Sequence, residues 1–204
     1  MTNEELRQSL LMEPKNGYTL ITAAQRTEME NYCKECMIMT SAYFAGGCFW
    51  CIMPAFAETD GVHSVTSGYC GGEELNPVYD DVKHQRTGHR ETIRIEYDES
   101  KVTFAALLEL FLQQVDPFDE GGQFIDRGHS YTLAVYYTDE PQRAETLIRL
   151  AALSGETGKA VHIAVEPLRT FWTAEEEHQD YYLKHPAEFE QELIDSGRKP
   201  APEA

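Results

Sequence analysis

The spacing of hydrophobic positions changes along the chain and predicts alternating strands and helices. Ile93 and Ile95 alternate with the polar Arg94 and Glu96, as in a strand with one buried face. Between positions 102 and 115, hydrophobic residues recur at the three-to-four spacing of an amphipathic helix. On this basis we expect strands at 42–45, 62–69, 91–97, 131–137 and 161–166, and helices at 48–58, 102–115, 142–153 and 174–183.

The order of these elements predicts the fold class. Between residues 42 and 137 it is β-α-β-β-α-β, which indicates an α/β protein of the two-layer α+β sandwich type with a split β-α-β, ferredoxin-like core. The segments 76–79 and 118–130 are expected to be loops, the second because it is rich in glycine. Residues 1–40 contain two helix-like stretches, 3–12 and 23–36, and the pattern fades after Pro186. We expect a helical N-terminal extension (1–40), a main domain (41–190) and a C-terminal tail (191–204).

Composition and charge narrow the class of partner. Hydrophobic residues make up 42% of the chain, enough for a sizeable core, and 17 Lys and Arg against 35 Asp and Glu give a net charge of −18. This surplus argues against nucleic acid or an anionic membrane as partner, because binding to phosphates needs a positive surface. No hydrophobic run approaches the roughly 20 residues of a membrane-spanning helix, and residues 1–5 do not resemble the start of a secretory signal. A cytoplasmic location is therefore expected.

The run Gly46-Gly47-Cys48 places a cysteine at the turn between a predicted strand and a predicted helix. Glycine permits a tight turn and close approach of a substrate. The free N–H groups and partial positive charge of a helix start stabilise a thiolate, and such settings lower a cysteine pKa from about 8.5 to between about 3.5 and 7.5. A lone cysteine is more often a small buried hydrophobic residue. The glycines, the helix start and a second thiol at Cys51 favour a reactive nucleophile instead.

The five cysteines leave a metal site as the rival interpretation. Cys33/Cys36 and Cys48/Cys51 are two Cys-x-x-Cys pairs, a strong signal for a four-thiolate zinc site when turns surround both pairs. Against zinc, the first pair falls in a predicted helix, and the two residues inside the second pair are bulky aromatics. We therefore expect catalysis and no bound metal.

Six blocks of the sequence resemble those of the A-type peptide methionine sulfoxide reductases (MsrA), in the order of that family. Together they cover residues 43 to about 186, so the similarity is far more specific than a single motif. The chain departs from the family at Ser130, Thr132 and Val115, where the family has Gln, Arg and His. The blocks are YFAGGCFWC (43–51), VTSGYCGG (65–72), NPVYDDV (76–82), TGHRE (87–91), DRGHSY (126–131) and FWTAEEEHQDYY (171–182).

This resemblance implies an enzyme, a peptide-methionine (S)-S-oxide reductase with 41–190 as its catalytic domain, that uses no cofactor or metal. It implies reduction of the S epimer of methionine sulfoxide, free or in proteins, as a repair of oxidative damage. Attack by Cys48 would leave a sulfenic acid on that residue. The other implied site residues are the acid Glu91, the phenols Tyr79 and Tyr131 that bind the sulfoxide oxygen, Asp126 beside the nucleophile, and Phe49 and Trp50 around the substrate methyl group.

A second thiol must reduce the sulfenic acid. Cys51 matches the resolving position in one subgroup of the family, with Cys70, Cys33 and Cys36 as alternatives. Residues i and i+3 of a regular helix have Cβ atoms about 5–6 Å apart, whereas a disulfide needs about 3.5–4.5 Å, so the first helical turn would have to rearrange. The resemblance implies thioredoxin as the reductant, and we expect a monomer.

Two competing functions stay open on the residues alone. A general thiol–disulfide oxidoreductase would use the dithiol, but it gives no reason for Glu91, Tyr79 and Tyr131. A zinc-stabilised binding module would hold about one zinc ion per chain and lose its fold on chelation. His89 and the segment 178–182 are expected to brace the site rather than to take part in chemistry.

Overall fold

A computed structural model of the chain describes residues 39–199. The helices expected at 3–12 and 23–36, and with them Cys33 and Cys36, lie outside the described residues. Internal contacts divide the chain into two units, residues 1–37 and 38–204, and the described residues all belong to the second. Within residues 39–199, no helix is long and apolar enough to cross a membrane.

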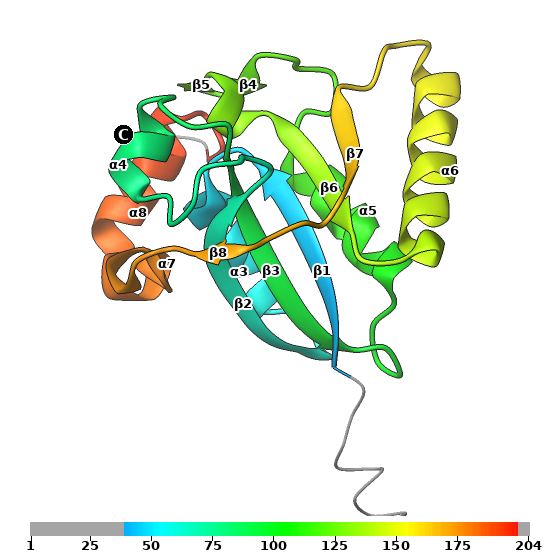
Figure 1. Ribbon diagram of the computed structural model, residues 1–204, viewed down its shortest axis with the longest axis horizontal. Helices are drawn as coiled ribbons and strands as arrows, with labels where there is room; N and C mark the ends of the chain where they lie inside the picture. Colours follow the sequence, from blue (N-terminus) through cyan, green and yellow to red (C-terminus); the bar gives the residue numbers. More distant parts are fainter. Residues whose placement is uncertain (1–38, 200–204) are drawn as a thin grey trace, which may run out of the picture. The chain divides into compact units, whose positions relative to one another are not determined.

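A six-stranded sheet in the order β7-β6-β1-β3-β2-β8 forms the centre of this unit (Figure 1). Strand β3 pairs antiparallel with both β1 and β2, and β1 also pairs antiparallel with β6. β1 and β2 therefore run in the same direction with β3 between them, which is the split β-α-β arrangement and confirms the predicted fold class. The core elements are β1 (Met39–Gly46), α3 (Phe49–Ala57), β2 (Val62–Cys70), β3 (Arg90–Asp98), α5 (Phe104–Gln114) and β6 (Leu133–Tyr137).

Further segments extend the sheet at both edges. Helix α6 (Glu140–Thr157) begins after Asp139, whose side chain accepts a hydrogen bond from the Gln142 N–H at 2.9 Å. It leads into β7 (Ile163–Pro167), which runs parallel to β6. The chain then crosses the sheet to β8 (Trp172–Thr173) at the edge formed by β2 (Figure 1). This crossing places the C-terminal segment near α3.

The main hydrophobic core lies between the sheet and helices α3 and α5. Phe44 of β1 is fully buried there, and its ring stacks on Phe111 of α5 with the centroids 4.8 Å apart. Successive strand residues face opposite sides of a sheet, so Ala45 lies on the other face, in a smaller cluster with Tyr136 that Phe171 packs against. Burying one large apolar side chain stabilises a fold by about 1.5–3 kcal/mol. Both clusters therefore fix the end of β1, where the chain turns into α3.

The segment after β8 is not the single helix expected at 174–183. It contains a 3-10 turn, η2 (Glu176–His178), and a short helix, α7 (Tyr181–Lys184), separated by Asp180 with a left-handed φ of 51°. The side-chain amide of Gln179 explains the break. It accepts a hydrogen bond from the Ser67 N–H at 2.8 Å and donates one to the Ser67 carbonyl at 2.9 Å. The amide thus satisfies the edge of β2 in place of a further strand.

The expectation that the pattern fades after Pro186 was wrong. Helix α8 (Pro186–Asp195) occupies this segment, so the expected domain boundary at 190/191 falls inside a helix. Proline suits the first position of a helix, because its missing N–H would be unpaired there. The helix has no fully buried residue, and its apolar side chains, such as Phe189 and Leu193, are only half-buried. Because the segment has so few apolar residues, its sequence did not predict a helix that packs on the rest of the protein.

The two predicted loops also contain short elements. Helix α4 (Tyr79–Lys83) begins at the end of the segment 76–79. The segment 118–130 holds a two-stranded ribbon of β4 (Gly122–Gln123) and β5 (Asp126–Arg127), followed by the 3-10 turn η1 (His129–Tyr131). These elements are too short to show a hydrophobic period in the sequence.

Candidate active site

The turn between β1 and α3 places Cys48 at the start of a helix. Gly47 has a φ of 79°, in the left-handed region that favours glycine. A Cβ atom would lie 2.7 Å from Ile52 Cδ1 if added to Gly46, and 2.7 Å from Gln123 Cβ if added to Gly47. The turn therefore has room for glycine alone, and Cys48 follows it as the N-cap of α3 with only 4% of its surface exposed.

Glu91 of β3 lies beside this turn and is 1% exposed. Its Oε2 accepts a hydrogen bond from the Phe49 N–H at 3.1 Å, and its Oε1 has no partner among the described residues. Burial raises the pKa of Glu91 to about 8, although the Phe49 hydrogen bond opposes this shift, and the nearby carboxylates of Asp126 and Glu192 add to it. Glu91 consequently carries a proton at neutral pH.

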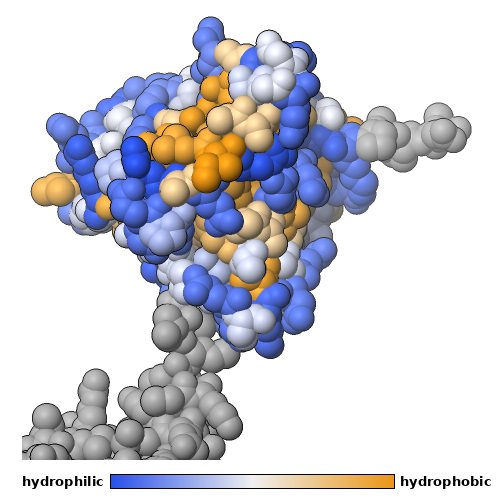
Figure 2. All heavy atoms as spheres, turned by 90° about the vertical axis from the view of Figure 1, so that its right-hand side faces the viewer, coloured by the Kyte–Doolittle hydropathy of each residue, from blue (hydrophilic) through white to orange (hydrophobic). Residues whose placement is uncertain are grey.

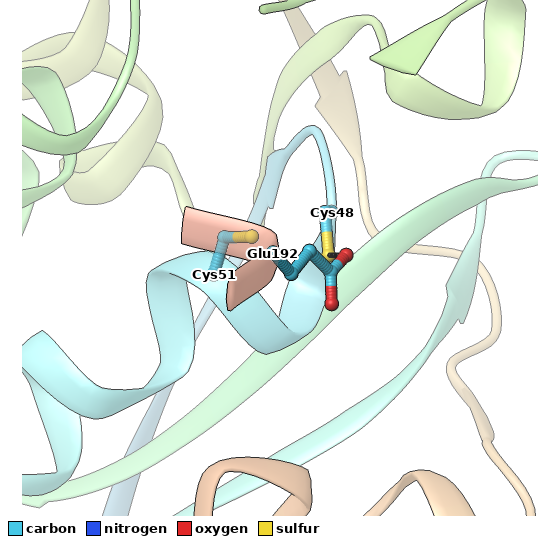
Figure 3. Close-up of side chains that lie close together, drawn as sticks. All are labelled: Cys48, Cys51 and Glu192. Atoms are coloured by element: carbon cyan, nitrogen blue, oxygen red, sulfur yellow. Dashed lines mark hydrogen bonds between the residues drawn. The ribbon is translucent and has the colours of Figure 1, made fainter. Parts of the chain in front are cut away.

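The thiol of Cys48 contacts a residue that sequence analysis did not identify. Its Sγ donates a hydrogen bond to Glu192 Oε1 of α8 at 3.7 Å (Figure 3). The two sulfurs of Cys48 and Cys51 and one oxygen of Glu192 lie within 4.8 Å of one another. Cys48 is thus covered by α8, whose Glu192 follows it by 144 residues.

The pKa of the Cys48 thiol is raised well above its usual value, against the expectation of a lowered one. A hydrogen bond with Cys51 is the largest cause, burial is the second, and the charges of Glu91 and Glu192 add to both. The Phe49 N–H would be available to a thiolate at this helix start, but it donates to Glu91. The Cys48 side chain caps no helix amide. The first amide of α3 therefore binds the Glu91 carboxyl and not the Cys48 sulfur.

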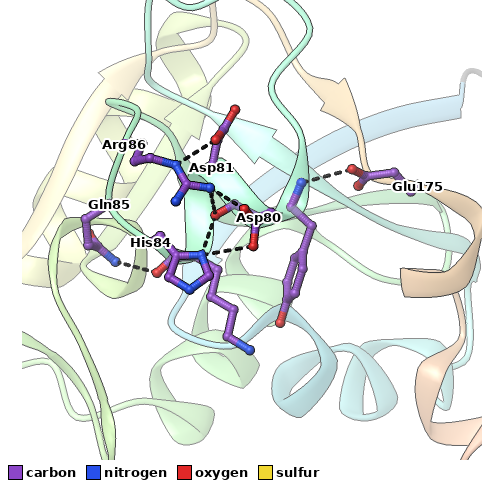
Figure 4. Close-up of polar contacts among 8 residues, drawn as sticks. Asp80, Asp81, His84, Gln85, Arg86 and Glu175 are labelled. Atoms are coloured by element: carbon purple, nitrogen blue, oxygen red, sulfur yellow. Dashed lines mark hydrogen bonds and ion pairs between the residues drawn. The ribbon is translucent and has the colours of Figure 1, made fainter.

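The two predicted phenols both face this group. Burial raises the pKa of Tyr79 and of Tyr131, and Glu91 is the next largest cause for each. Both phenols thus stay protonated and can donate hydrogen bonds at neutral pH. The backbone N–H of Tyr79 donates to Glu175 Oε1 at 2.9 Å, which holds the start of α4 against the segment after β8 (Figure 4).

Gln85, just after α4, holds Ser130, the residue before Tyr131, and sequence analysis did not identify it. Its side chain accepts a hydrogen bond from the Ser130 N–H at 3.0 Å and donates one to Ser130 Oγ at 2.6 Å. In the family that the sequence resembles, a glutamine occupies the position of Ser130. An amide from another segment of the chain thus bonds to the residue that precedes Tyr131. On the other side, Thr132 Oγ1 accepts a hydrogen bond from Arg90 Nε at 2.9 Å.

Asp126 lies at the edge of the same group, on β5, and is half-buried. Burial raises its pKa, while Arg198 and Lys83 lower it. Arg198 lies beyond α8, where its guanidinium covers the ring of Phe124 at 4.1 Å and donates to the Gln114 carbonyl at 3.3 Å. These contacts attach the end of α8 to the loop that carries Asp126.

The predicted aromatic pair divides into one core residue and one site residue. Phe49 is fully buried in the main core. Trp50 is partly exposed, and its ring stacks on Tyr181 of α7 with the centroids 4.0 Å apart. His178 lies 5.6 Å from Trp50 and 4.0 Å from Tyr79, again between ring centroids. The bracing role expected for 178–182 thus corresponds to direct packing of this segment on the site.

Cys70, the third cysteine among residues 39–199, points away from Cys48. The ring of the preceding residue, Tyr69, lies 6.0 Å from that of Phe49 on the α3 side of the sheet. Because strand residues alternate, Cys70 falls on the other face, where its thiol donates to the Thr170 carbonyl at 3.5 Å. His89 is a fully buried spacer that accepts a hydrogen bond from the Gly72 N–H at 3.2 Å.

The arrangement combines a nucleophile with several proton-bearing groups. Cys48 can attack an electrophilic atom, and a protonated Glu91 can give a proton to the charge that this attack creates. Two phenols can donate hydrogen bonds to the same atom. A second thiol, Cys51, lies close enough to attack an oxidised Cys48.

Comparisons with known proteins agree with this chemistry. The family model described as peptide methionine sulfoxide reductase matches residues 40–203. Peptide methionine sulfoxide reductase MsrA of Bacillus licheniformis is 44% identical over 160 residues, which are 78% of this chain and 88% of that protein. The protein of the same name from Streptococcus mutans is 43% identical over 153 residues, which are 74% of this chain and 90% of that protein.

Solved structures show the same fold. Methionine sulfoxide reductase A of Corynebacterium diphtheriae superposes with a TM-score of 0.65 at 28% identity, over 72% of this chain and 74% of that one. The reduced form of Mxr1 from Saccharomyces cerevisiae superposes with a TM-score of 0.69 at 24% identity, over 72% of this chain and 86% of that one.

Replacing Glu192 by Gln is expected to raise the rate at which iodoacetamide alkylates Cys48 at pH 7 several-fold. The change removes a negative charge that opposes the thiolate and puts an amide donor in place of an acceptor. Tandem mass spectrometry of quenched samples separates alkylation of Cys48 from that of Cys51. Glu188→Gln makes the same charge change at an exposed position of α8 and should leave the rate unchanged. Equal acceleration in both variants would rule out a specific effect of the Glu192 carboxylate.

Proposed function

Because the chain belongs to the peptide methionine sulfoxide reductase family and reduces methionine sulfoxide to methionine, we propose that the reaction proceeds at Cys48. Its thiolate attacks the sulfoxide sulfur, and the sulfoxide oxygen passes to Cys48. One methionine and one sulfenic acid are formed, and no other atom is gained or lost. The proposed substrate is the S epimer of methionine sulfoxide, free or in proteins.

The buried carboxyl of Glu91 is the observation that supports this mechanism most directly. Negative charge grows on the sulfoxide oxygen as Cys48 attacks, and a proton donor at that point lowers the barrier. Glu91 has a pKa of about 8, and its hydrogen bond to the Phe49 N–H holds it next to Cys48. In the proposed reaction Glu91 gives its proton to the oxygen, and it regains one from solvent to balance the proton lost by the Cys48 thiol.

The phenols and the aromatic residues complete the proposed site. We assign to Tyr79 and Tyr131 the two hydrogen bonds that hold the sulfoxide oxygen, since both phenols remain protonated. Asp126 is assigned a place beside the nucleophile and substrate. The substrate methyl group is assigned to the predicted pair Phe49 and Trp50: the partly exposed ring of Trp50 offers it an apolar surface, and the buried ring of Phe49 backs that surface at 5.7 Å between ring centroids.

Cys51 is the proposed resolving thiol. Its sulfur attacks the sulfenic acid, so that the Cys48–Cys51 disulfide forms and one water molecule leaves. The sulfurs lie within 4.8 Å, and Cys48 is an N-cap outside the regular helix, which makes a small rearrangement sufficient. Cys70 faces the other side of the sheet and is the weaker candidate. The proposed reductant is thioredoxin, whose dithiol would become a disulfide as the enzyme is reset.

The proposed setting is a cytoplasmic monomer that acts without nucleic acid or membrane. The net charge of −18 supports this proposal, because it disfavours surfaces rich in phosphate.

An epimer-resolved assay tests the function. Purified protein with a dithiol reductant is expected to convert the S epimer of methionine sulfoxide and leave the R epimer, as measured by chiral chromatography of the products. Cys48→Ser should lose turnover by at least about three orders of magnitude, because a hydroxyl cannot replace the thiolate. Disulfide exchange on generic substrates without sulfoxide reduction would instead identify a thiol–disulfide oxidoreductase.

Cys51→Ser is expected to keep the first half of the reaction and lose the second. Without added thiol, the variant should release one methionine per chain and leave a sulfenic acid on Cys48, which dimedone traps for mass spectrometry. Turnover with thioredoxin should fall sharply, whereas Cys70→Ser serves as the matched control and should recycle normally. Normal recycling of Cys51→Ser would show that another thiol resolves the intermediate.

The rate of a single turnover is expected to rise with pH up to about 8 and to level off above it. The pKa of the Cys48 thiol is raised well above its usual value, so its thiolate fraction grows throughout this range. Burial raises the pKa of Glu91 to about 8, so the acid form that donates the proton is present below that pH and is lost above it, which offsets the growing thiolate fraction. In Glu91→Gln the levelling near pH 8 should disappear, and the rate below pH 8 should drop roughly 10²- to 10⁴-fold, as is typical for loss of a general acid. Rapid-quench measurements between pH 6 and 10 follow both effects. Levelling near pH 8 that survives in Glu91→Gln would assign it to a different group.

A further inference from the structure

The geometry points to a metal site at the nucleophile: we propose that the reduced enzyme binds one zinc ion reversibly through Cys48, Cys51 and Glu192, and that this ion inhibits it. The ligand atoms of these three residues lie within 4.8 Å of one another. Elsewhere among residues 39–199, no other group of three His, Cys, Asp or Glu residues brings its ligand atoms as close together.

The spacing of these atoms suits a tetrahedral ion. Zinc binds cysteine sulfur at about 2.3 Å and carboxylate oxygen at about 2.0–2.2 Å, so bound sulfur and oxygen atoms lie about 3.5–3.8 Å apart. Cys48 Sγ and Glu192 Oε1 are 3.7 Å apart before any adjustment. In Figure 3 the Cys48 sulfur lies beside the Glu192 carboxylate, and the Cys51 side chain extends from the first turn of α3. A small rotation of the Cys51 side chain would complete a three-ligand set.

The chemistry of the ligands also favours zinc. Two thiolates in a Cys-x-x-Cys unit are a common half of a zinc site, and thiolates select zinc over magnesium or calcium. Cys48 and Cys51 are both buried, so little water competes for the ion. With three protein ligands the fourth position stays open, as in catalytic rather than structural zinc sites. The third ligand comes from α8 and not from Cys33 or Cys36, which distinguishes this site from the four-thiolate site considered for the sequence.

Binding of the ion would block the enzyme without altering its oxidation state. Each thiol releases one proton to solvent as its sulfur bonds to zinc, and no electrons move. Cys48 is then unable to attack a sulfoxide, and it is equally protected from oxidation. Removal of the ion by a chelator returns both thiols. The fold does not depend on the ion, because the core under α3 is closed by Phe44, Phe111 and their neighbours.

Calorimetric titration of the reduced full-length protein with zinc chloride tests the proposal. The background is Cys33→Ser/Cys36→Ser, so that this pair contributes no thiol. One ion per chain is expected. Adding Glu192→Gln or Cys51→Ser should weaken binding by about tenfold or more, since each removes one of three ligands. Adding Glu188→Gln or Cys70→Ser, the matched controls, should not change it.

Protection of Cys48 is the second measurement. Zinc at saturating concentration should slow alkylation of Cys48 at least about tenfold, and a chelator should restore the rate while circular dichroism stays unchanged. Equal affinity with and without Glu192→Gln, or loss of zinc binding in the Cys33→Ser/Cys36→Ser background alone, would overturn the three-ligand site. Loss of the fold on chelation would overturn it as well, in favour of a structural zinc. None of these readouts requires reductase activity, so they stand apart from the test of the reaction.

Discussion

A hydrogen bond between the Phe49 N–H and the buried carboxyl of Glu91 joins strand β3 to the first turn of α3, and the site is arranged around it. Along β3, Glu91, Ile93 and Ile95 lie on the same face, because alternate strand residues point to the same side. That face carries the main core, so Glu91 extends the hydrophobic stripe with an ionisable residue. Leaving a buried polar partner unpaired costs about 1–3 kcal/mol. The hydrogen bond from the Phe49 N–H avoids that cost for Glu91 Oε2. Burial raises the pKa of Glu91, so the carboxyl keeps its proton.

The same bond decides the state of the nucleophile. A helix start normally stabilises a thiolate, but its first amide can serve one acceptor well, and here that acceptor is Glu91. Cys48 instead lies among Cys51 and two carboxyls, and its pKa rises. The resting enzyme therefore stores a protonated thiol. Reactivity at neutral pH then depends on what enters the site and displaces or neutralises these neighbours.

Much of the fold could be predicted from the sequence because its signals are local. The alternation of Ile93 and Ile95 and the helical spacing of the hydrophobic residues between 102 and 115 each identify one element, and their order identifies the split β-α-β core. The residues Cys48, Glu91, Tyr79 and Tyr131 could be named through their motifs, and the structure brings their side chains to one place.

The features that escaped prediction depend on contacts between distant segments. Glu192 lies in a polar helix with no fully buried residue, and nothing in its local sequence indicates that it contacts a cysteine 144 residues earlier. Gln85 supports Tyr131 through Ser130, a pairing that no spacing rule describes. Gln179 ends a helix by bonding to a strand edge. Each case is a side chain whose partner is fixed only by the tertiary fold.

The order of α3 and α8 along the chain has a consequence for biosynthesis. Proteins are made from the N-terminus, and domains fold as their segments emerge from the ribosome. Strand β1, helix α3 and Cys48 are translated before α8, whose Glu192 lies 144 residues after Cys48. A nascent chain therefore carries the Cys48 thiol without its helical cover until α8 has emerged and packed.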